Sequence, residues 1–81
     1  MVYFYGPHCA TCARQAAVLD ELARDHEVVR VDAAREAALA DALNVATVPA
    51  TAVVDAAGRV RALNLGYQPR DALAEQLARA S

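Results

Sequence analysis

Two cysteines, Cys9 and Cys12, lie where a short apolar run gives way to a helical pattern. The run Val2 to Tyr5 ends at Gly6-Pro7, which predicts a buried strand followed by a turn. Cysteines three apart in mid-helix lie about 5 to 6 Å apart at Cβ, too far for an easy disulfide, but Cys9 is expected to precede the helix. The positive end of a helix also stabilises a thiolate there. The sequence therefore predicts a dithiol that closes and reopens.

An amphipathic helix is predicted to follow the dithiol, from Ala10 to Asp25. Apolar residues recur in this segment at helical spacing, and polar residues occupy the remaining positions. The expected buried side carries Cys12, Ala16, Leu19, Leu22 and Ala23, and the expected exposed side carries Arg14, Gln15, Asp20, Glu21 and Arg24. A helix with one apolar side is expected to pack on a sheet.

A second strand and a second helix are predicted next. The strand is Val28-Val29-Arg30-Val31, which is short and rich in valine. Asp32 follows and is expected to cap a helix from Ala33 to Leu43. Asn44 is expected to end that helix in a left-handed conformation.

The last part of the chain predicts a hairpin and a third helix. Ala50 to Val54 and Val60 to Leu65 are extended segments, joined by a turn over 55–59. Pro69 is expected at the first position of a helix that carries Leu73 and Leu77 on one side. The predicted order is βαβαββα, with a parallel pair first and antiparallel strands added by the hairpin.

Size and composition limit the functions open to the chain. Its 81 residues suffice for one small domain, and a hydrophobic fraction of 57% favours a folded core. The net charge of −2 has no basic cluster, so nucleic-acid binding is not expected. No apolar stretch is long enough for a membrane span, and no signal peptide is evident, so a cytoplasmic protein without a membrane partner is expected. In a reducing cytosol, Cys-x-x-Cys is more often catalytic or metal-binding than structural.

With Cys-x-x-Cys after the first strand and Thr47-Val48-Pro49 before the third, the chain resembles the thioredoxin and glutaredoxin superfamily. Gly58 in the hairpin and Gly66 before the last helix stand where thioredoxins also have glycines. The resemblance implies an α/β, thioredoxin-like fold with a four-stranded mixed sheet flanked by three helices, in a single domain over residues 1–81. It begins at the strand before the dithiol, so the chain is expected to lack the extra amino-terminal strand and helix of full-length thioredoxins.

The resemblance also implies a catalytic role for each cysteine. Cys9 would be the exposed nucleophile that attacks a substrate disulfide and forms a mixed disulfide. Cys12 would be the buried resolving thiol that attacks Cys9 and releases the reduced substrate.

A substrate-binding surface follows from the same resemblance. Pro49 would be a cis-proline, and Val48 would lie beside the dithiol with its backbone free to pair with an extended substrate segment. A side chain at Gly66 would obstruct the approaching partner, and Tyr67 would cover the edge of the groove. His8, directly before the nucleophile, would favour the thiolate when its imidazole is protonated.

Some residues depart from the family's pattern. Thioredoxins usually have Trp-Cys-Gly-Pro-Cys, whereas His8 precedes the first cysteine here and Ala10-Thr11 separate the pair. Tyr3 stands where thioredoxins have a buried acidic residue that manages the proton of the second thiol. Proton transfer to and from Cys12 would then need water, His8 or a tyrosine hydroxyl. Arg70 and Asp71 only weakly match the glutathione-binding charges of glutaredoxins.

We therefore expect a monomeric oxidoreductase that reduces disulfides in other proteins, with no bound cofactor and with electrons from a separate disulfide reductase. Within the class, the alternatives are a glutathione-dependent glutaredoxin or an electron donor to ribonucleotide reductase. Outside it, the alternative is a small metal-binding or metal-delivery domain. A zinc site needs four ligands, and the cysteine and histidine side chains that could supply them are Cys9, Cys12, His8 and His26. His26 is predicted to lie one helix length from the other three, so no metal site is expected.

Overall fold

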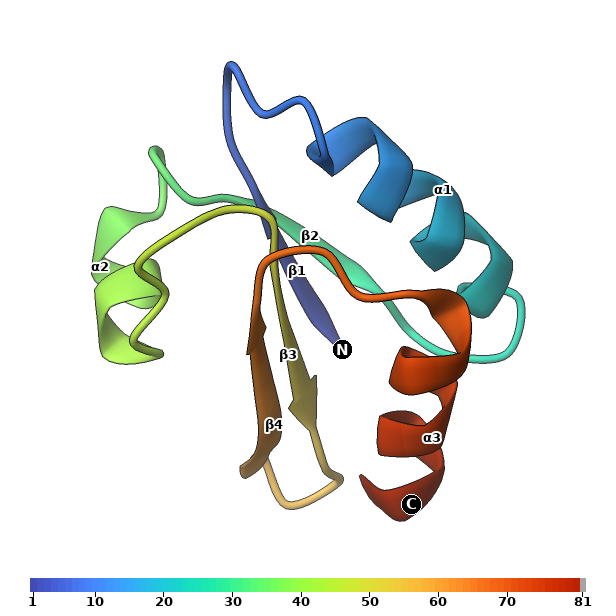
Figure 1. Ribbon diagram of the computed structural model, residues 1–81. Coiled ribbons are helices and arrows are strands. Elements are labelled where there is room, and N and C mark those ends of the chain that lie inside the picture. Colours follow the sequence, from blue (N-terminus) through green and yellow to red (C-terminus); the bar gives the residue numbers. More distant parts are fainter. Residues whose placement is uncertain (81) are drawn as a thin grey trace.

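A computed structural model describes residues 1–80 as a four-stranded sheet with helices on both faces (Figure 1). The elements are β1 (Val2–Tyr5), α1 (Cys12–Leu22), β2 (Val29–Asp32), α2 (Ala37–Ala42), β3 (Ala50–Val54), β4 (Val60–Leu65) and α3 (Arg70–Ala80). The strand order is β2-β1-β3-β4, in which only the β1–β2 pair is parallel. The predicted βαβαββα order and thioredoxin-like fold class are confirmed.

The larger core lies between the sheet and the helices α1 and α3, which Figure 1 shows on the same side of the sheet. Neighbouring residues of a strand point to opposite faces, so Tyr3 faces these helices while Phe4 faces α2. The buried members of this core are Tyr3, Leu19, Leu22, Val53, Leu73 and Leu77. Burial of each large apolar side chain contributes about 1.5 to 3 kcal/mol, which fixes both helices on the sheet.

The opposite face has a smaller core under α2. Phe4, Ala40 and Ala50 form this second cluster, and Phe4 is completely buried. Because α2 is only six residues long, it covers part of the face, and Val29 and Leu65 at the two sheet edges stay about half exposed. The position of β1 is thus set from both sides of the sheet.

Several predicted boundaries of helices and strands were wrong. The helix predicted from Ala10 begins at Cys12 and ends at Leu22, because residues 23–25 form turns. The strand predicted over 28–31 is shifted by one residue, to Val29–Asp32. The last helix begins at Arg70, so Pro69 directly precedes it.

The second helix is much shorter than predicted, and the role of Asp32 differs. The Asp32 carboxylate accepts hydrogen bonds from the backbone N–H groups of Ala34 (2.9 Å) and Arg35 (3.3 Å), but it stabilises a turn rather than the helix. Glu36, with φ −106° and ψ 51°, lies outside helical geometry, so α2 starts only after it. Asn44 has φ 60°, which confirms the predicted left-handed stop. In the described part of the chain, no helix is long and apolar enough to cross a bilayer.

Candidate functional site

Cys9 and Cys12 form a disulfide at the amino end of α1. The S–S distance is 2.08 Å and the Cα–Cα distance is 5.3 Å. Cys12 is the first residue of α1, whereas Cys9 lies in the preceding turn, which is closed by a 3.2 Å hydrogen bond from Cys12 N to Cys9 O. Cys12 is only 8% exposed and Cys9 is partly exposed. A partner that approaches from solvent therefore meets the sulfur of Cys9 first.

The start of α1 leaves its positive end uncompensated by side chains. Thr11 occupies the N-cap position without a side-chain capping bond, and the first turn contains no acidic residue. The first backbone N–H groups and the helix dipole therefore remain available to stabilise an anion, which favours a thiolate at Cys9 when the disulfide is reduced. The Thr11 hydroxyl lies 3.9 Å from Cys9 Sγ and can donate to that thiolate. Sequence reasoning did not single out Thr11.

The loop before β3 lies at the same end of the sheet as the dithiol. β3 and β1 are antiparallel, so Pro49 at the amino end of β3 is close to the carboxyl end of β1. The Val48–Pro49 peptide bond is cis, as the resemblance implied. A Cβ placed on Gly6 would lie 3.2 Å from Val48 Cγ2, so Val48 packs directly on the chain that leads from β1 to the dithiol.

Gly66 and Tyr67 lie next to the cis-proline loop. Together with Val48 and Pro49 they form the surface that we call the rim of the dithiol. Gly66 N donates a 2.8 Å hydrogen bond to Pro49 O, which joins the β4–α3 loop to the cis-proline loop. Gly66 has φ +99°, and a Cβ built on it would meet no atom within 4 Å, so the space beside it is open. Tyr67 is half-buried, and the Arg14 guanidinium lies 4.5 Å from its ring centroid. Their predicted contacts with substrate stay predictions.

His8 is exposed in the turn before Cys9, with φ 57°. Residues other than glycine seldom adopt this left-handed conformation, although histidine does so more often than most. His8 is thus an exposed residue of the turn, directly before the nucleophile in the sequence. No periodicity in the sequence indicated this conformation.

Gln15 was predicted on the exposed side of the helix, and this was wrong. Its side chain is completely buried and forms two hydrogen bonds with the backbone of Gln68. Gln15 Nε2 donates to Gln68 O (3.1 Å), and Gln68 N donates to Gln15 Oε1 (2.8 Å). The loop backbone at Gln68 is part-buried and gains partners for both of its polar groups, so Gln15 attaches the β4–α3 loop to α1 one turn after Cys12.

The side chain of Tyr3, on β1, contacts the backbone of Cys12. Its hydroxyl donates a 2.9 Å buried hydrogen bond to Cys12 O, and its burial raises the pKa of the phenol. A groove of about 300 Å³ runs beside this contact. It is lined by Tyr3, Tyr5, Cys12, Ala13, Ala16 and Arg30.

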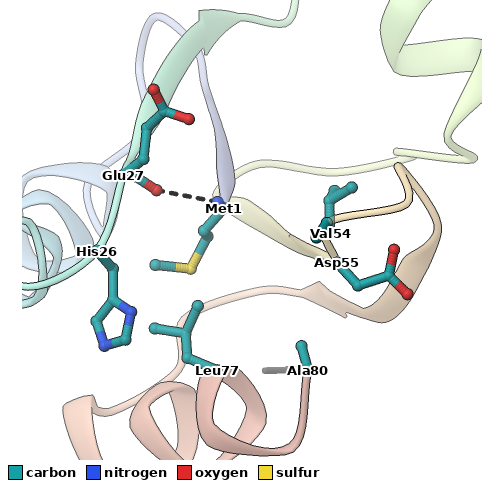
Figure 2. Close-up of a pocket in the computed structure, with 8 residues that line it drawn as sticks. Met1, His26, Glu27, Val54, Asp55, Leu77 and Ala80 are labelled. Carbon is teal, nitrogen blue, oxygen red and sulfur yellow. Dashed lines mark hydrogen bonds between the residues drawn. The ribbon is translucent and has the colours of Figure 1, made fainter.

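A second cavity, of about 380 Å³, lies at the opposite end of the sheet (Figure 2). It is lined by the start of β1, the ends of β3 and α3, and the α1–β2 connection. The Met1 ammonium donates to Glu27 O, and the carboxylates of Glu27 and Asp55 point away from the cavity in Figure 2. His26 also lies here rather than near the dithiol. Within residues 1–80, no group of three or more His, Cys, Asp or Glu side chains could hold a metal ion.

Comparisons with known proteins agree with this geometry. The family model for thioredoxin matches residues 1–79. A solved structure described as a malarial protein superposes with a TM-score of 0.85 at 18% identity, covering 98% of this chain and 92% of the other. Thioredoxin-2 of the malaria parasite, described as a component of its protein secretion machinery, superposes with a TM-score of 0.86 at 18% identity, covering 96% and 79%. Among proteins of curated function, none matches the sequence significantly.

Proposed function

This chain belongs to the thioredoxin family, and on that premise we propose that it reduces disulfide bonds in other proteins through Cys9 and Cys12. Family membership together with the disulfide-bonded pair supports thiol–disulfide oxidoreductase chemistry in general. The observation that carries the finer proposal is the asymmetry of the pair. Cys9 is accessible and precedes the helix, while Cys12 is buried in its first turn.

The reaction begins with the reduced protein. The Cys9 thiolate attacks one sulfur of the substrate disulfide, the substrate S–S bond breaks, and the departing sulfur leaves as a thiolate that takes a proton from solvent. Cys12 then loses its proton and attacks Cys9 Sγ. The bond between Cys9 and the substrate breaks, and the second substrate thiol is released. Two electrons pass from the dithiol to the substrate, and the Cys9–Cys12 disulfide is formed.

The surface around Cys9 would bind an extended segment of the substrate protein. The backbone of Val48 would pair with that segment, as in strand addition at a sheet edge, and the open space beside Gly66 would admit it. Pro49, Tyr67 and His8 would border the same surface around Cys9. The partners in this proposal are protein disulfides and a separate disulfide reductase that restores the dithiol, and the protein acts as a cytoplasmic monomer without a bound cofactor.

An insulin reduction assay tests the proposal. The protein is incubated with insulin and NADPH, either with thioredoxin reductase or with glutathione and glutathione reductase. We expect catalytic turnover with thioredoxin reductase, and none for Cys9→Ser. Turnover only with glutathione would instead favour a glutaredoxin. No reduction of insulin by the chemically reduced protein in stoichiometric amounts would contradict the proposal altogether.

A further inference from the structure

Arg14 is a cation without a carboxylate partner at the rim of the dithiol. It is exposed in the first turn of α1, two residues after Cys12. Within residues 1–80, no carboxylate lies within ion-pair distance of its guanidinium. The arginines that do pair with a carboxylate are Arg30, Arg61, Arg70 and Arg79. An unpaired charge is common on a protein surface, so the position of Arg14 decides whether it has a role.

The ring of Tyr67 holds the Arg14 side chain in place. The carbon of the guanidinium lies 4.5 Å from the ring centroid, within the range of about 6 Å for a cation–π contact. Tyr67 is half-buried and directly follows Gly66, whose N–H donates to Pro49 O, so the ring is attached to the cis-proline loop. The positive charge is therefore held beside the proposed substrate surface.

Helix geometry directs the same side chain towards Cys9. Long side chains of an α-helix lean towards its amino end and cover the surface over the preceding turn. For Arg14 that turn includes residues 10 and 11, which directly follow Cys9. At a rise of about 1.5 Å per residue, Arg14 is only about 3 Å further along the helix axis than Cys12. A substrate segment that binds at Cys9 and beside Gly66 therefore passes close to this guanidinium.

The contact with Tyr67 leaves the guanidinium able to bind a ligand. A cation–π contact uses no N–H group, so the planar fork of donors remains available for a carboxylate, which it can bind through two parallel hydrogen bonds. An arginine already fixed on a ring also loses less side-chain entropy when it binds. The ligand chemistry that fits Arg14 is therefore the carboxylate of an Asp or Glu side chain.

The acidic side chains around this part of the molecule leave the charge of Arg14 in place. Glu21 and Asp71 both contact Arg70, at 3.6 and 3.3 Å. Glu21 also lies seven residues after Arg14 on α1, roughly 10 Å along the helix axis. Asp41 is on α2, which packs on the opposite face of the sheet, and it lines a pocket there. Arg14 therefore gives the α1 side of the rim a local positive charge, although the whole chain carries −2.

We propose that Arg14 makes this protein select substrate segments that carry Asp or Glu beside the reactive cysteine. The inference rests on the proposed function, because it names the class of substrate that binds at the rim of the dithiol. The substrate carboxylate binds the guanidinium while the neighbouring disulfide meets Cys9. Arg14 takes no part in bond formation. Charges at the edge of an interface act mainly on the association rate, so the selectivity is a difference in the rate of mixed-disulfide formation.

Peptides with one activated cysteine measure this selectivity. Each peptide has a central cysteine in mixed disulfide with pyridine-2-thiol, and its flanking residues are all Glu, all Gln or all Lys. The Cys9 thiolate attacks the peptide sulfur, the S–S bond to the pyridine breaks, and pyridine-2-thione is released and measured by its absorbance. The same reaction with 2-mercaptoethanol gives the intrinsic reactivity of each peptide, by which the rate with the protein is divided.

The corrected ratio of the Glu and Gln peptides isolates recognition from other effects of a substitution. Both peptides meet the same protein, so changes in the ionised fraction of Cys9 or in the folded fraction cancel. His8 is present in every variant, so its contribution is constant. A merely structural role of Arg14 would change both rates and leave the ratio as it was.

We expect a corrected Glu-to-Gln ratio of about two to five for the unmodified protein at low salt, as for one exposed ion pair. Arg14→Gln should bring this ratio near one. Arg14→Glu should bring it below one and favour the Lys peptide. At about 1 M salt, where the Debye length is about 3 Å, the ratio of the unmodified protein should also approach one.

Arg24→Gln is the matched control. Arg24 is exposed and also has no carboxylate partner among the described residues. It follows the end of α1 at Leu22, which is roughly 12 Å along the axis from Arg14, so its loss should leave the ratio unchanged.

A ratio near one for the unmodified protein at low salt, or equal ratios for the unmodified protein and Arg14→Gln, would overturn the inference and leave the proposed function intact. Release of pyridine-2-thione by Cys9→Ser as fast as by the unmodified protein would instead overturn the proposed function.

Discussion

The side-chain amide of Gln15 pairs with the backbone of Gln68 through two hydrogen bonds, of 3.1 and 2.8 Å. Gln68 lies two residues after Gly66, whose N–H in turn donates to Pro49 O. The helix that begins with Cys12, the β4–α3 loop and the cis-proline loop are therefore connected in series. The mutual positions of the dithiol and its rim depend on Gln15.

Gln15→Ala should loosen this connection. The part-buried N–H and C=O of Gln68 would lose their partners, and a fully buried unsatisfied group costs about 1 to 3 kcal/mol. We expect the free energy of unfolding in urea to fall by about 1 to 2 kcal/mol, and insulin reduction to slow. Gln68→Ala is the control, since it keeps the backbone groups that Gln15 binds. Equal losses for both variants would show that the two hydrogen bonds contribute little.

The two cysteines should differ in reactivity after reduction. Cys9 is partly exposed at an uncapped helix start, and thiols in such places have pKa values of about 3.5 to 7.5, whereas Cys12 is 8% exposed. We expect iodoacetamide near pH 7 to label Cys9 at least about tenfold faster than Cys12, measured by mass spectrometry of the peptides. Equal, slow labelling of both cysteines would contradict the assigned roles.

Gly66→Ala should affect both stability and substrate access. With φ +99°, an alanine would be strained by about 1 to 2 kcal/mol, and its methyl group would enter the open space beside the dithiol rim. Gly58→Ala is a matched control, because Gly58 also has a positive φ (+82°) and open space but lies in the distant β3–β4 hairpin. We expect similar losses of stability, but a lower kcat/KM for insulin only in Gly66→Ala. Unchanged turnover there would remove Gly66 from the proposed binding surface.

Asp55 should make stability depend on pH in the acid range. Its carboxylate accepts backbone hydrogen bonds from Arg59 and Ala57 and lies near the Arg61 guanidinium, and these partners, Arg59 first, lower its pKa below the usual value. Because the folded-state pKa is depressed, the carboxylate stabilises the fold above the unfolded-state pKa of about 4, and this contribution is lost as pH falls through the folded-state pKa.

We therefore expect Asp55→Asn to lower the urea midpoint at pH 7, with the difference from the unmodified protein shrinking below about pH 4. Asp41→Asn, on the exposed surface of α2, should show little difference at either pH. A constant difference for Asp55→Asn across this range would contradict the assignment.

The sequence predicted the strands and the position of the dithiol because both depend on local signals. Val2–Tyr5 and Ala50–Val54 are short apolar runs bounded by turn residues, and the structure places strands at these same residues. Asn44 and the 55–59 hairpin were equally accessible, since left-handed conformations and tight turns favour particular residues.

Gln15 and α2 could not be predicted in the same way. Amphipathic periodicity assigns an amide to the exposed side, but Gln15 is buried because the backbone of Gln68, 53 residues later, requires its donor and acceptor. The start of α2 is delayed because the Asp32 carboxylate bonds the backbone of Ala34 and Arg35 in a turn, and such side-chain bonds compete with a helix. The contact of Tyr3 with Cys12 likewise depends on how α1 packs across β1.

The most direct test of the account is whether Cys12→Ser holds a substrate protein as a covalent adduct. The sequence contains only two cysteines, so this variant keeps Cys9 alone as a nucleophile. After incubation with insulin, intact-mass and peptide analysis should show an insulin molecule disulfide-bonded to Cys9, stable until dithiothreitol is added, and no adduct for Cys9→Ser under the same conditions. Failure of Cys12→Ser to form this adduct, or equal adducts from both variants, would contradict the assignment of Cys9 as nucleophile and Cys12 as resolving thiol.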